Sequence, residues 1–484
     1  METIQVGDVI SSKVANQRLR LEERLVYRRR NIPASGIALT AAALAFAAGA
    51  QTPSTDAEPP WPRVAEEPQT GDSLVGSEVD EAANKVTLGE YLDAINIVEL
   101  EIDKIERRSN RYNIELAEPL VVLGDALVGV GDFPGAFGAY DRALHITRVN
   151  RGLHHPSQVD IVYREAALHA ASGDSERANT RHEYAYNLLL RSFGSGDPAL
   201  LPGLFALADW YLTNYNIFSA RALYRHAVYV SAKADDDDDA AMIRALRGVA
   251  ASYLSERFPP YHEPRTQAPG SSGPYTSRTR SIGSINSFGR GERALIEVVR
   301  VVNAREDGTN EDRAAAILEL GDWFLMFGKH QRATTLYRRA WELLSTNESL
   351  LAETFRSPTP LYLPLPTRPE RSRKPVGEPR NGVIELSLRI DEEGAVSEID
   401  MLRSEPEDLI DDEVRRAVRR ARYRPAFDGQ DSLATDGVLV SHSFVYFATD
   451  EPAGPTGRVG ESSDEASSAP TPVDAIVQAR GGQP

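Results

Sequence analysis

The hydrophobic and small residues in the middle of the chain recur with a fixed period. Alanine stands at Ala94, Ala136, Ala178 and Ala220, a constant step of 42 residues. Three more columns keep this step in register: Ala143, Ala185 and Ala227; Tyr140, His182 and Tyr224; Gly124, Ala166 and Ala208. A fixed period of this length is typical of stacked structural repeats, because one such unit cannot bury its apolar face alone. The pattern therefore predicts a repeat solenoid over residues 80–350.

Within one period, the apolar positions follow the spacing of two helices. Residues 115–130 place Leu120, Leu123 and Leu127 on one helical face, and residues 135–146 carry the alanine and aromatic columns on another. A Gly-Asp-Phe-Pro sequence between them indicates a turn. Each period is thus a predicted helical hairpin. The predicted fold class is an all-α solenoid followed by a small α+β domain.

These hairpins resemble the tetratricopeptide repeat, which has a small residue in its first helix and Ala, an aromatic residue and Ala in its second. The pattern returns at Gly321 with Ala333, Tyr337 and Ala340, and the 42-residue step resembles the longer repeats of kinesin light chains. The resemblance implies a concave surface that binds proteins. Residues 258–290, rich in Pro, Gly, Ser and Arg, interrupt one repeat and predict a loop insertion, either disordered or a site for an acidic partner.

Three aspartates directly follow the small residue of the first helix in their repeats: Asp125, Asp209 and Asp322. In the resembling repeats this position faces the concave side, so the resemblance implies an acidic stripe along a solenoid groove. Such a stripe favours a basic peptide as partner. The alternative is an ordinary solvated helix face.

Beyond residue 350 the pattern changes to that of a small sheet. Residues 351–381 are Pro-rich and predict an extended linker. A strand with one buried face follows, because apolar residues alternate with polar ones. These apolar residues are Ile384, Leu386, Leu388 and Ile390. Residues 391–394 predict a hairpin turn, and the return strand changes its apolar phase between Val396 and Ile399, which indicates a bulge.

A helix and a last strand complete this unit. An amphipathic helix of about 14 residues is predicted from apolar positions at helical spacing. These positions are Ile410, Val414, Ala417, Val418 and Ala421. The last apolar strand spans residues 437–447. The predicted unit therefore has a three-stranded antiparallel sheet and one helix.

Residues 382–447 resemble the C-terminal domain of TonB proteins. The matching positions are Gly382, Ile390, Asp391, Gly394, Val396, Ser404, the helix 411–422, Tyr423, Pro425, Ala426 and Gly429. The resemblance implies that residues 382–449 bind a short extended segment of a receptor along the final strand. Three strands and one helix also leave an edge open, which favours strand addition.

The partner-binding residues predicted for this strand edge are Val438, Val440, His442, Phe444 and Tyr446. Two alternatives remain open. The acidic tail folds back over the edge, or two copies pair with each other as a homodimer.

The N-terminal sequence predicts export. Three arginines at 28–30 precede an apolar stretch at 36–50 that ends in Ala-Gly-Ala, a signal peptide pattern. We predict a signal peptide with an extended n-region over residues 1–50, a disordered linker over 51–79 and a disordered acidic tail over 450–484. The expected location is the periplasm. If residues 36–50 are retained instead of cleaved, the protein is anchored in the inner membrane.

Composition and motifs narrow the chemistry. The chain has 54 Lys and Arg against 71 Asp and Glu, a net charge of −17, which argues against nucleic acid as a partner. It has no cysteine, and it lacks the G-x-S-x-G, P-loop and H-E-x-x-H motifs. His154 and His155 are candidate metal ligands, but His155-Pro156 fits a helix cap better. We predict no catalytic site, no metal and no cofactor.

The function that these patterns favour is protein recognition without catalysis. We expect an exported adaptor in which the solenoid is the scaffold and the C-terminal domain binds a periplasmic or outer-membrane protein. The alternative that the resemblance implies is a membrane-anchored TonB-type energy transducer, which couples an inner-membrane motor complex to outer-membrane transport. A cell-envelope enzyme is a third candidate.

Overall fold

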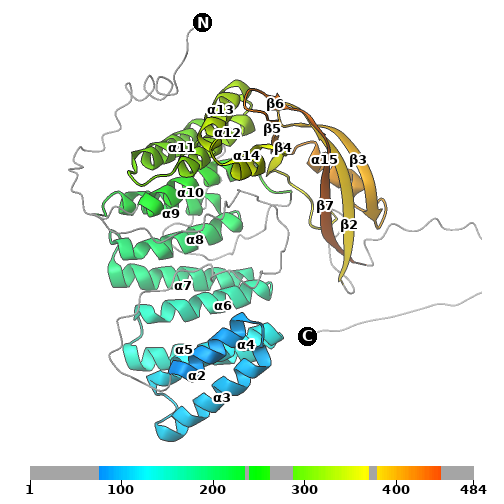
Figure 1. Ribbon diagram of the computed structural model, residues 1–484. Helices are drawn as coiled ribbons and strands as arrows, with labels where there is room; N and C mark the ends of the chain where they lie inside the picture. The colour runs from blue at the N-terminus through cyan, green and yellow to red at the C-terminus, as the bar shows by residue number, and fades with distance from the viewer. Residues whose placement is uncertain (1–75, 235–238, 262–286, 370–378, 448–484) are drawn as a thin grey trace, which may run out of the picture.

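The computed structural model of the chain describes residues 76–234, 239–261, 287–369 and 379–447. The predicted signal peptide, most of the linker 51–79, the centre of the insertion 258–290 and the tail 450–484 lie outside these residues. The described residues form a stack of helices joined at its C-terminal end to a small sheet domain (Figure 1).

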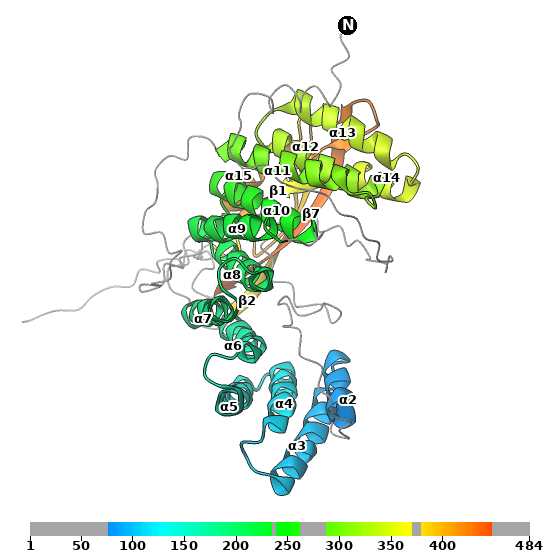
Figure 2. The ribbon, with the colours of Figure 1, turned by 90° about the vertical axis from the view of Figure 1, so that its left-hand side faces the viewer.

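Six successive helical hairpins make up the stack in the described part of the chain, as the repeat pattern predicts. They are α2 (Gly76–Thr87) with α3 (Tyr91–Arg108), α4 (Ala117–Val130) with α5 (Phe133–Arg151), α6 (Val159–Ala171) with α7 (Ser175–Phe193), α8 (Leu201–Thr213) with α9 (Ile217–Ser231), α10 (Asp239–Arg257) with α11 (Ser287–Ala304), and α12 (Asn310–Met326) with α13 (His330–Leu344). A short helix, α14 (Glu348–Phe355), follows. Figure 2 shows the hairpins as successive layers, with α3 inclined to the helices above it.

Local sequence explains where the hairpins turn. After α4, Gly131 takes the left-handed conformation with φ of 83°, which glycine adopts without a steric cost. Asp132 then caps α5, because its carboxylate accepts a hydrogen bond from the Gly135 amide at 3.0 Å. Asp174 caps α7 in the same way through the Arg177 amide. The Gly-Asp pair therefore ends one helix and begins the next.

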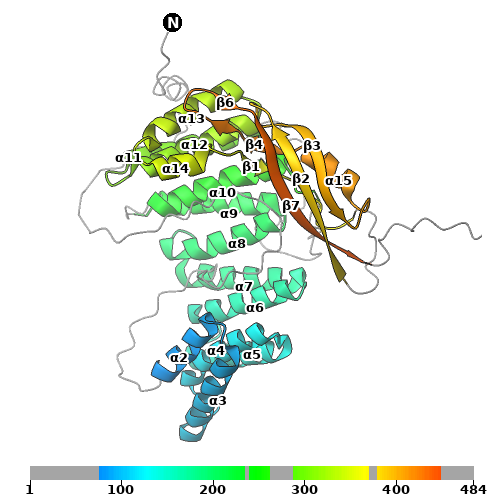
Figure 3. The same cartoon turned by 45° about the vertical axis from the view of Figure 1, so that its right-hand side comes forward.

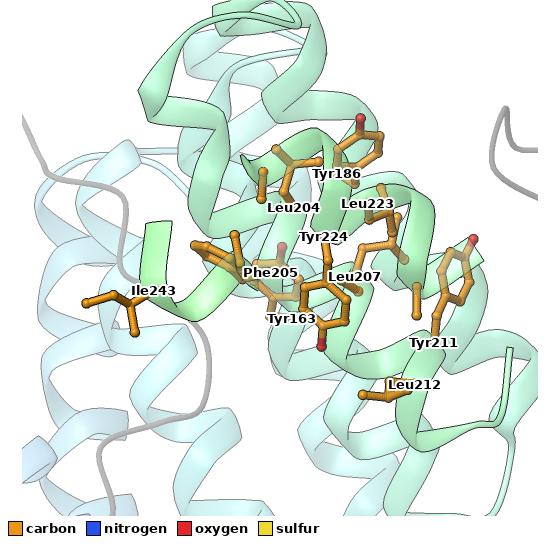
Figure 4. Close-up of a cluster of buried hydrophobic side chains, with 14 of the residues drawn as sticks. Tyr163, Tyr186, Leu204, Phe205, Leu207, Tyr211, Leu212, Leu223, Tyr224 and Ile243 are labelled. Carbon is orange, nitrogen blue, oxygen red and sulfur yellow. The ribbon is translucent and has the colours of Figure 1, made fainter. Parts of the chain in front are cut away.

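The columns of small residues are the positions where helices meet. All seven alanines of the two alanine columns are fully buried. A Cβ atom at Gly124 would clash with the Tyr140 ring of the paired helix, so only glycine lets these helices approach so closely. Figure 4 shows part of the buried core of the stack, to which Tyr163 of α6, Leu204 of α8 and Tyr224 of α9 contribute.

The C-terminal domain is built on one antiparallel sheet in the order β3-β2-β7 (Figure 3). Its strands are β2 (Pro379–Ile390), β3 (Val396–Glu405) and β7 (Thr435–Phe447). Two shorter pairs join β1 (Thr359–Tyr362) to β4 (Arg422–Arg424) and β5 (Ala426–Phe427) to β6 (Ser432–Leu433). One face of the sheet packs against α15 (Asp411–Val418), as the predicted α+β unit requires.

The details of the hairpin confirm the sequence pattern. The alternating residues from Ile384 to Ile390 are buried, and Gly394 in the turn has a φ of 78°. The predicted bulge is present, because Arg389 pairs with Glu398 and Ile390 pairs with Val396, which leaves Ser397 unpaired. The helix is shorter than predicted, with eight residues. It stops because the chain must be extended at residues 422–424 to pair with β1.

The structure corrects the prediction that residues 351–381 are only a Pro-rich, extended linker. Up to residue 369 the segment packs against the rest of the protein. Its first residues belong to α14, and β1 pairs with β4. Leu363 and Leu365 pack against the core of the sheet domain. The Tyr362 hydroxyl donates to the Pro259 carbonyl at 2.6 Å. Proline favours an extended backbone but does not prevent edge pairing, so the Pro-rich composition predicts the conformation and not the packing.

The sheet domain and the solenoid share one core at their junction. Phe427 of β5 is buried against the rings of Tyr337, Trp341 and Phe355, with centroid distances of 6.2, 5.9 and 5.6 Å. Gly429 lies directly against Trp341. The C-terminal domain therefore docks on the end of the helical stack through apolar contacts.

Candidate functional site

The three aspartates of the predicted stripe occupy equivalent places in the structure. Each accepts a hydrogen bond from the tyrosine hydroxyl 15 residues later in the same hairpin. The pairs are Asp125 with Tyr140, Asp209 with Tyr224, and Asp322 with Tyr337. Burial of the rings raises the pKa of all three tyrosines, so each hydroxyl remains a donor.

Each aspartate also has an arginine partner, from the next hairpin for Asp125 and Asp209 and from the sheet domain for Asp322. We name each set of Asp, Tyr and Arg a rung. The ion pairs are Asp125 with Arg164 of α6 at 2.9 Å, Asp209 with Arg244 of α10 at 2.8 Å, and Asp322 with Arg424 of β4 at 2.6 Å. The carboxylates of the predicted acidic stripe therefore already have cationic partners within the chain. Their proposed role in binding a basic peptide is untested.

The repeat between the first two rungs lacks this arrangement. At the step of 42 residues, Ala167 takes the place of aspartate and His182 takes the place of tyrosine. His182 instead stacks on Trp210 of α8 with a centroid distance of 4.6 Å, and burial lowers its pKa to about 4. A contact between two neutral rings thus joins the α6–α7 hairpin to the α8–α9 hairpin, whereas the hairpins with a rung use an ion pair.

The five side chains predicted for the strand edge lie on the inner face of β7. Phe444 and His442 are buried, and Val438, Val440 and Tyr446 pack against the core of the sheet domain. His442 Nε2 is 2.7 Å from the Pro366 carbonyl oxygen, and burial lowers its pKa. The structure corrects the prediction that these side chains bind the partner. Because side chains alternate between the two faces of a strand, all five point to the domain's own core.

The outer edge of β7 has backbone groups available for pairing. β7 pairs with β2 and with no other strand in the described residues. The Val445 amide points outward, because it donates to the Thr367 carbonyl at 3.0 Å. The backbone N–H and C=O groups of successive residues point to opposite edges of a strand. The other outward groups of β7 therefore belong to Leu439, Ser441 and Ser443. The Leu439 side chain is 74% exposed on the outer face of the sheet.

The described residues contain neither a candidate metal-binding cluster nor a candidate membrane-spanning helix. No group of three or more His, Asp or Glu side chains within them has the geometry to hold a metal ion. His155 acts as a cap, with Nδ1 accepting from the Ser157 amide at 3.2 Å. In the same residues, no helix is long and apolar enough to cross a membrane.

Comparison with known proteins finds a family match in the C-terminal part of the chain. Residues 373–444 match the family model of the Gram-negative bacterial TonB protein C-terminal. The chain combines tetratricopeptide-like helical repeats with a TonB-like domain. The match spans β2, β3, α15 and most of β7. Of the predicted edge residues, Val438, Val440, His442 and Phe444 lie within it.

Solved structures similar to the chain are helical repeat proteins. BtubC (BKLC) from P. vanneervenii is 16% identical, covers 57% of this chain and 93% of its own, and has a TM-score of 0.38. Putative kinesin light chain TPR-like repeats from Podosopora anserina are 16% identical, and the match covers 48% of this chain and 95% of theirs, with a TM-score of 0.36. No curated protein sequence matches the chain. The TonB C-terminal match and the repeat fold support a role in protein interaction.

Proposed function

We propose that the protein is an exported, non-catalytic interaction protein of the cell envelope. Its TonB-like domain binds an extended segment of a periplasmic or outer-membrane protein by strand addition to β7. The observation that carries this proposal is the outer edge of β7, which has no strand partner in the described residues. An incoming strand would satisfy its outward amides and carbonyls and cover exposed Leu439.

The two edges of the sheet are not equivalent, and β7 is the better docking edge. β3 has two bulges opposite β2, at Ser397 and Leu402. Bulges twist an edge and disturb its ladder, which protects it from further pairing. β7 pairs with β2 without interruption from Pro379–Phe447 to Leu388–Val438. A regular strand of this length presents a regular row of backbone groups.

The chain itself sets one end of the open stretch. Thr367 occupies the outer edge at Val445, so an incoming strand is limited to the part of β7 before that residue. The outward groups of Leu439, Ser441 and Ser443 remain. Three outward residues correspond to a partner segment of about five or six residues.

A pair of substitutions at one position tests strand addition. Ser443→Pro removes the outward backbone donor, whereas Ser443→Ala removes only the hydroxyl. We expect Ser443→Ala to capture the same envelope proteins as the unaltered chain, and Ser443→Pro to lose them. A photo-cross-linking residue at Leu439 then locates the bound segment. Equal capture by the two variants, with both folded by circular dichroism, would sink strand addition.

The alternative function is a membrane-anchored energy transducer of the TonB type. The family match favours it, and the predicted apolar stretch at 36–50 would be its anchor. Fractionation of cells followed by N-terminal sequencing separates the two functions. A mature chain that begins at Gln51 supports the exported adaptor, and a chain that retains residues 36–50 in the inner membrane supports the transducer. The molecular mass of the protein in solution shows whether two copies instead pair through β7 as a homodimer.

A further inference from the structure

A basic pocket lies between the solenoid and the TonB-like domain. Its volume is about 250 Å³. The lining residues come from three places in the chain: the end of α10, β1, and the segment from the end of α15 to β4. They are Arg257, Phe258, Tyr362, Arg419, Arg420 and Arg422. Four of the six carry a positive charge and none carries a negative one.

These four arginines have no ion pair with a carboxylate among the described residues. Their recorded polar contacts are with neutral groups: Arg420 Nη2 donates to the Tyr362 hydroxyl at 3.3 Å, and Arg422 Nη1 donates to the Ala421 carbonyl at 2.7 Å. The neighbouring Arg424, in contrast, is paired with Asp322. In a chain with a net charge of −17, four arginines that converge without a carboxylate partner in the described residues favour an anionic ligand.

The chemistry of the lining selects the ligand. Guanidinium groups present planar forks of donors that match phosphate and carboxylate oxygens. Phe258 and Tyr362 form an aromatic side of the pocket, with their ring centroids 5.4 Å apart. A dianionic phosphate group can share its oxygens among several forks, whereas a single carboxylate offers two oxygens and one charge. The pocket has room for one such group.

We infer that this pocket binds a phosphate group, as inorganic phosphate or as the phosphate of a small phosphorylated ligand. The bound group would bridge the two domains, because Arg257 belongs to the solenoid and Arg419 to the TonB-like domain. It would also relieve the repulsion among the four cations. Phosphate binding therefore tightens domain docking, and this consequence is independent of strand addition at β7.

The first test measures binding of inorganic phosphate to the full chain by calorimetry, with ionic strength held constant by chloride. The variant Arg419→Gln/Arg420→Gln should bind at least about tenfold more weakly. The control Arg151→Gln/Arg225→Gln removes two exposed arginines outside the pocket lining and should bind as the unaltered chain does. Arg419→Lys/Arg420→Lys keeps the charge without the forks and should fall between. Circular dichroism verifies folding of each variant.

Other probes distinguish the source of the phosphate. Glycerol phosphate that competes with inorganic phosphate supports a small phosphorylated ligand. Vesicles that contain phosphatidic acid and bind through the same arginines support a lipid headgroup as the source. A rise in melting temperature with phosphate in the unaltered chain, absent in Arg257→Gln, supports bridging. The inference is overturned if no saturable phosphate binding occurs, if the Gln variant and its control bind equally, or if a hexaglutamate peptide binds the pocket and phosphate does not.

Discussion

The first and third rungs use the same residues in different structural settings. Asp125 pairs with an arginine of the next helical hairpin, 39 residues later, whereas Asp322 pairs with Arg424, 102 residues later and in another domain. The stack has no seventh hairpin in the described residues, and β4 supplies the arginine that the next repeat would otherwise provide. The TonB-like domain thus completes the last repeat of the solenoid. Through this ion pair and the contacts of Phe427, the sheet domain that carries the proposed β7 binding edge is joined to the last hairpin of the solenoid.

The rungs also differ in burial, which ranks their energetic importance. The arginine and aspartate side chains are 13% and 18% exposed in the junction rung, 14% and 29% in the first rung, and 53% and 47% in the rung of Asp209. Removing one member of a buried pair is costly because the other charge stays buried, whereas exposed pairs contribute little. The junction rung should therefore be the most sensitive.

Loss of the carboxylate in the junction rung should have the largest effect. Asp322→Ala leaves Arg424 buried without a counter-charge and removes the acceptor of Tyr337, at a cost of about 3–5 kcal/mol. We expect the TonB-like domain to detach from the stack, with new proteolytic cleavage between α13 and β2. Urea unfolding measures the loss. Arg403→Gln, which breaks an exposed pair with Glu405, is the control and should change stability by less than about 1 kcal/mol. Similar losses in both variants would contradict the proposed capping role.

The α6–α7 hairpin, which lacks a rung, should show a pH dependence of its own. Glu165 of α6 is 1% exposed and lies 3.1 Å from Arg181. Burial raises its pKa to about 7, although Arg181 lowers it, and Asp141 raises it further. A carboxyl with a raised pKa binds its proton more tightly when folded. The free energy of unfolding should therefore fall as the pH rises from about 4.5 to 7, by at most about 3 kcal/mol.

Glu165→Gln tests this dependence. The variant should be more stable than the unaltered chain at pH 8 and equal to it at pH 4.5, as measured by chemical denaturation across that range. Asp160→Asn, which alters a more exposed carboxylate of the same helix, should leave the slope between pH 4.5 and 7 in place. An unchanged slope in Glu165→Gln would assign the pH dependence to another group.

The first rung should show an intermediate effect. Burial raises the pKa of Asp125, although Arg164 and the Tyr140 hydroxyl oppose the shift, so this ion pair offsets its own desolvation incompletely. Asp125→Ala should destabilise the chain by about 1–3 kcal/mol, because the Tyr140 hydroxyl loses its acceptor. Asp125→Asn keeps an acceptor and should cost less. Thermal unfolding of the two variants separates the hydrogen bond from the charge.

The sequence is sufficient to predict the repeats and the sheet but not their junction. The 42-residue columns predict hairpins because helix contacts recur locally, and the Asp and Tyr of each rung are readable from their spacing of 15 residues. The arginines are not, because they lie 39, 35 and 102 residues after their aspartates. Arg424 and Phe427 lie among the matching positions 423–426 of the TonB resemblance and directly after them, and nothing in the chain before them indicates that they complete a helical repeat. The pocket of four arginines escaped prediction for the same reason, since its residues are distant in sequence.

The smallest effect is expected at the rung of Asp209. Asp209→Asn removes an ion pair in which both side chains are about half exposed, so water and salt already screen the attraction. Asparagine still accepts a hydrogen bond from Tyr224. We expect a change of less than about 1 kcal/mol in urea unfolding, one that disappears at 1 M salt. A double mutant cycle of Asp209 and Arg244 should give a coupling that vanishes at 1 M salt, whereas a cycle of Asp322 and Arg424 should give one that persists. Equal, salt-sensitive couplings at both rungs would mean that burial does not distinguish the junction from the solenoid, and the TonB-like domain would then be only loosely held on its scaffold.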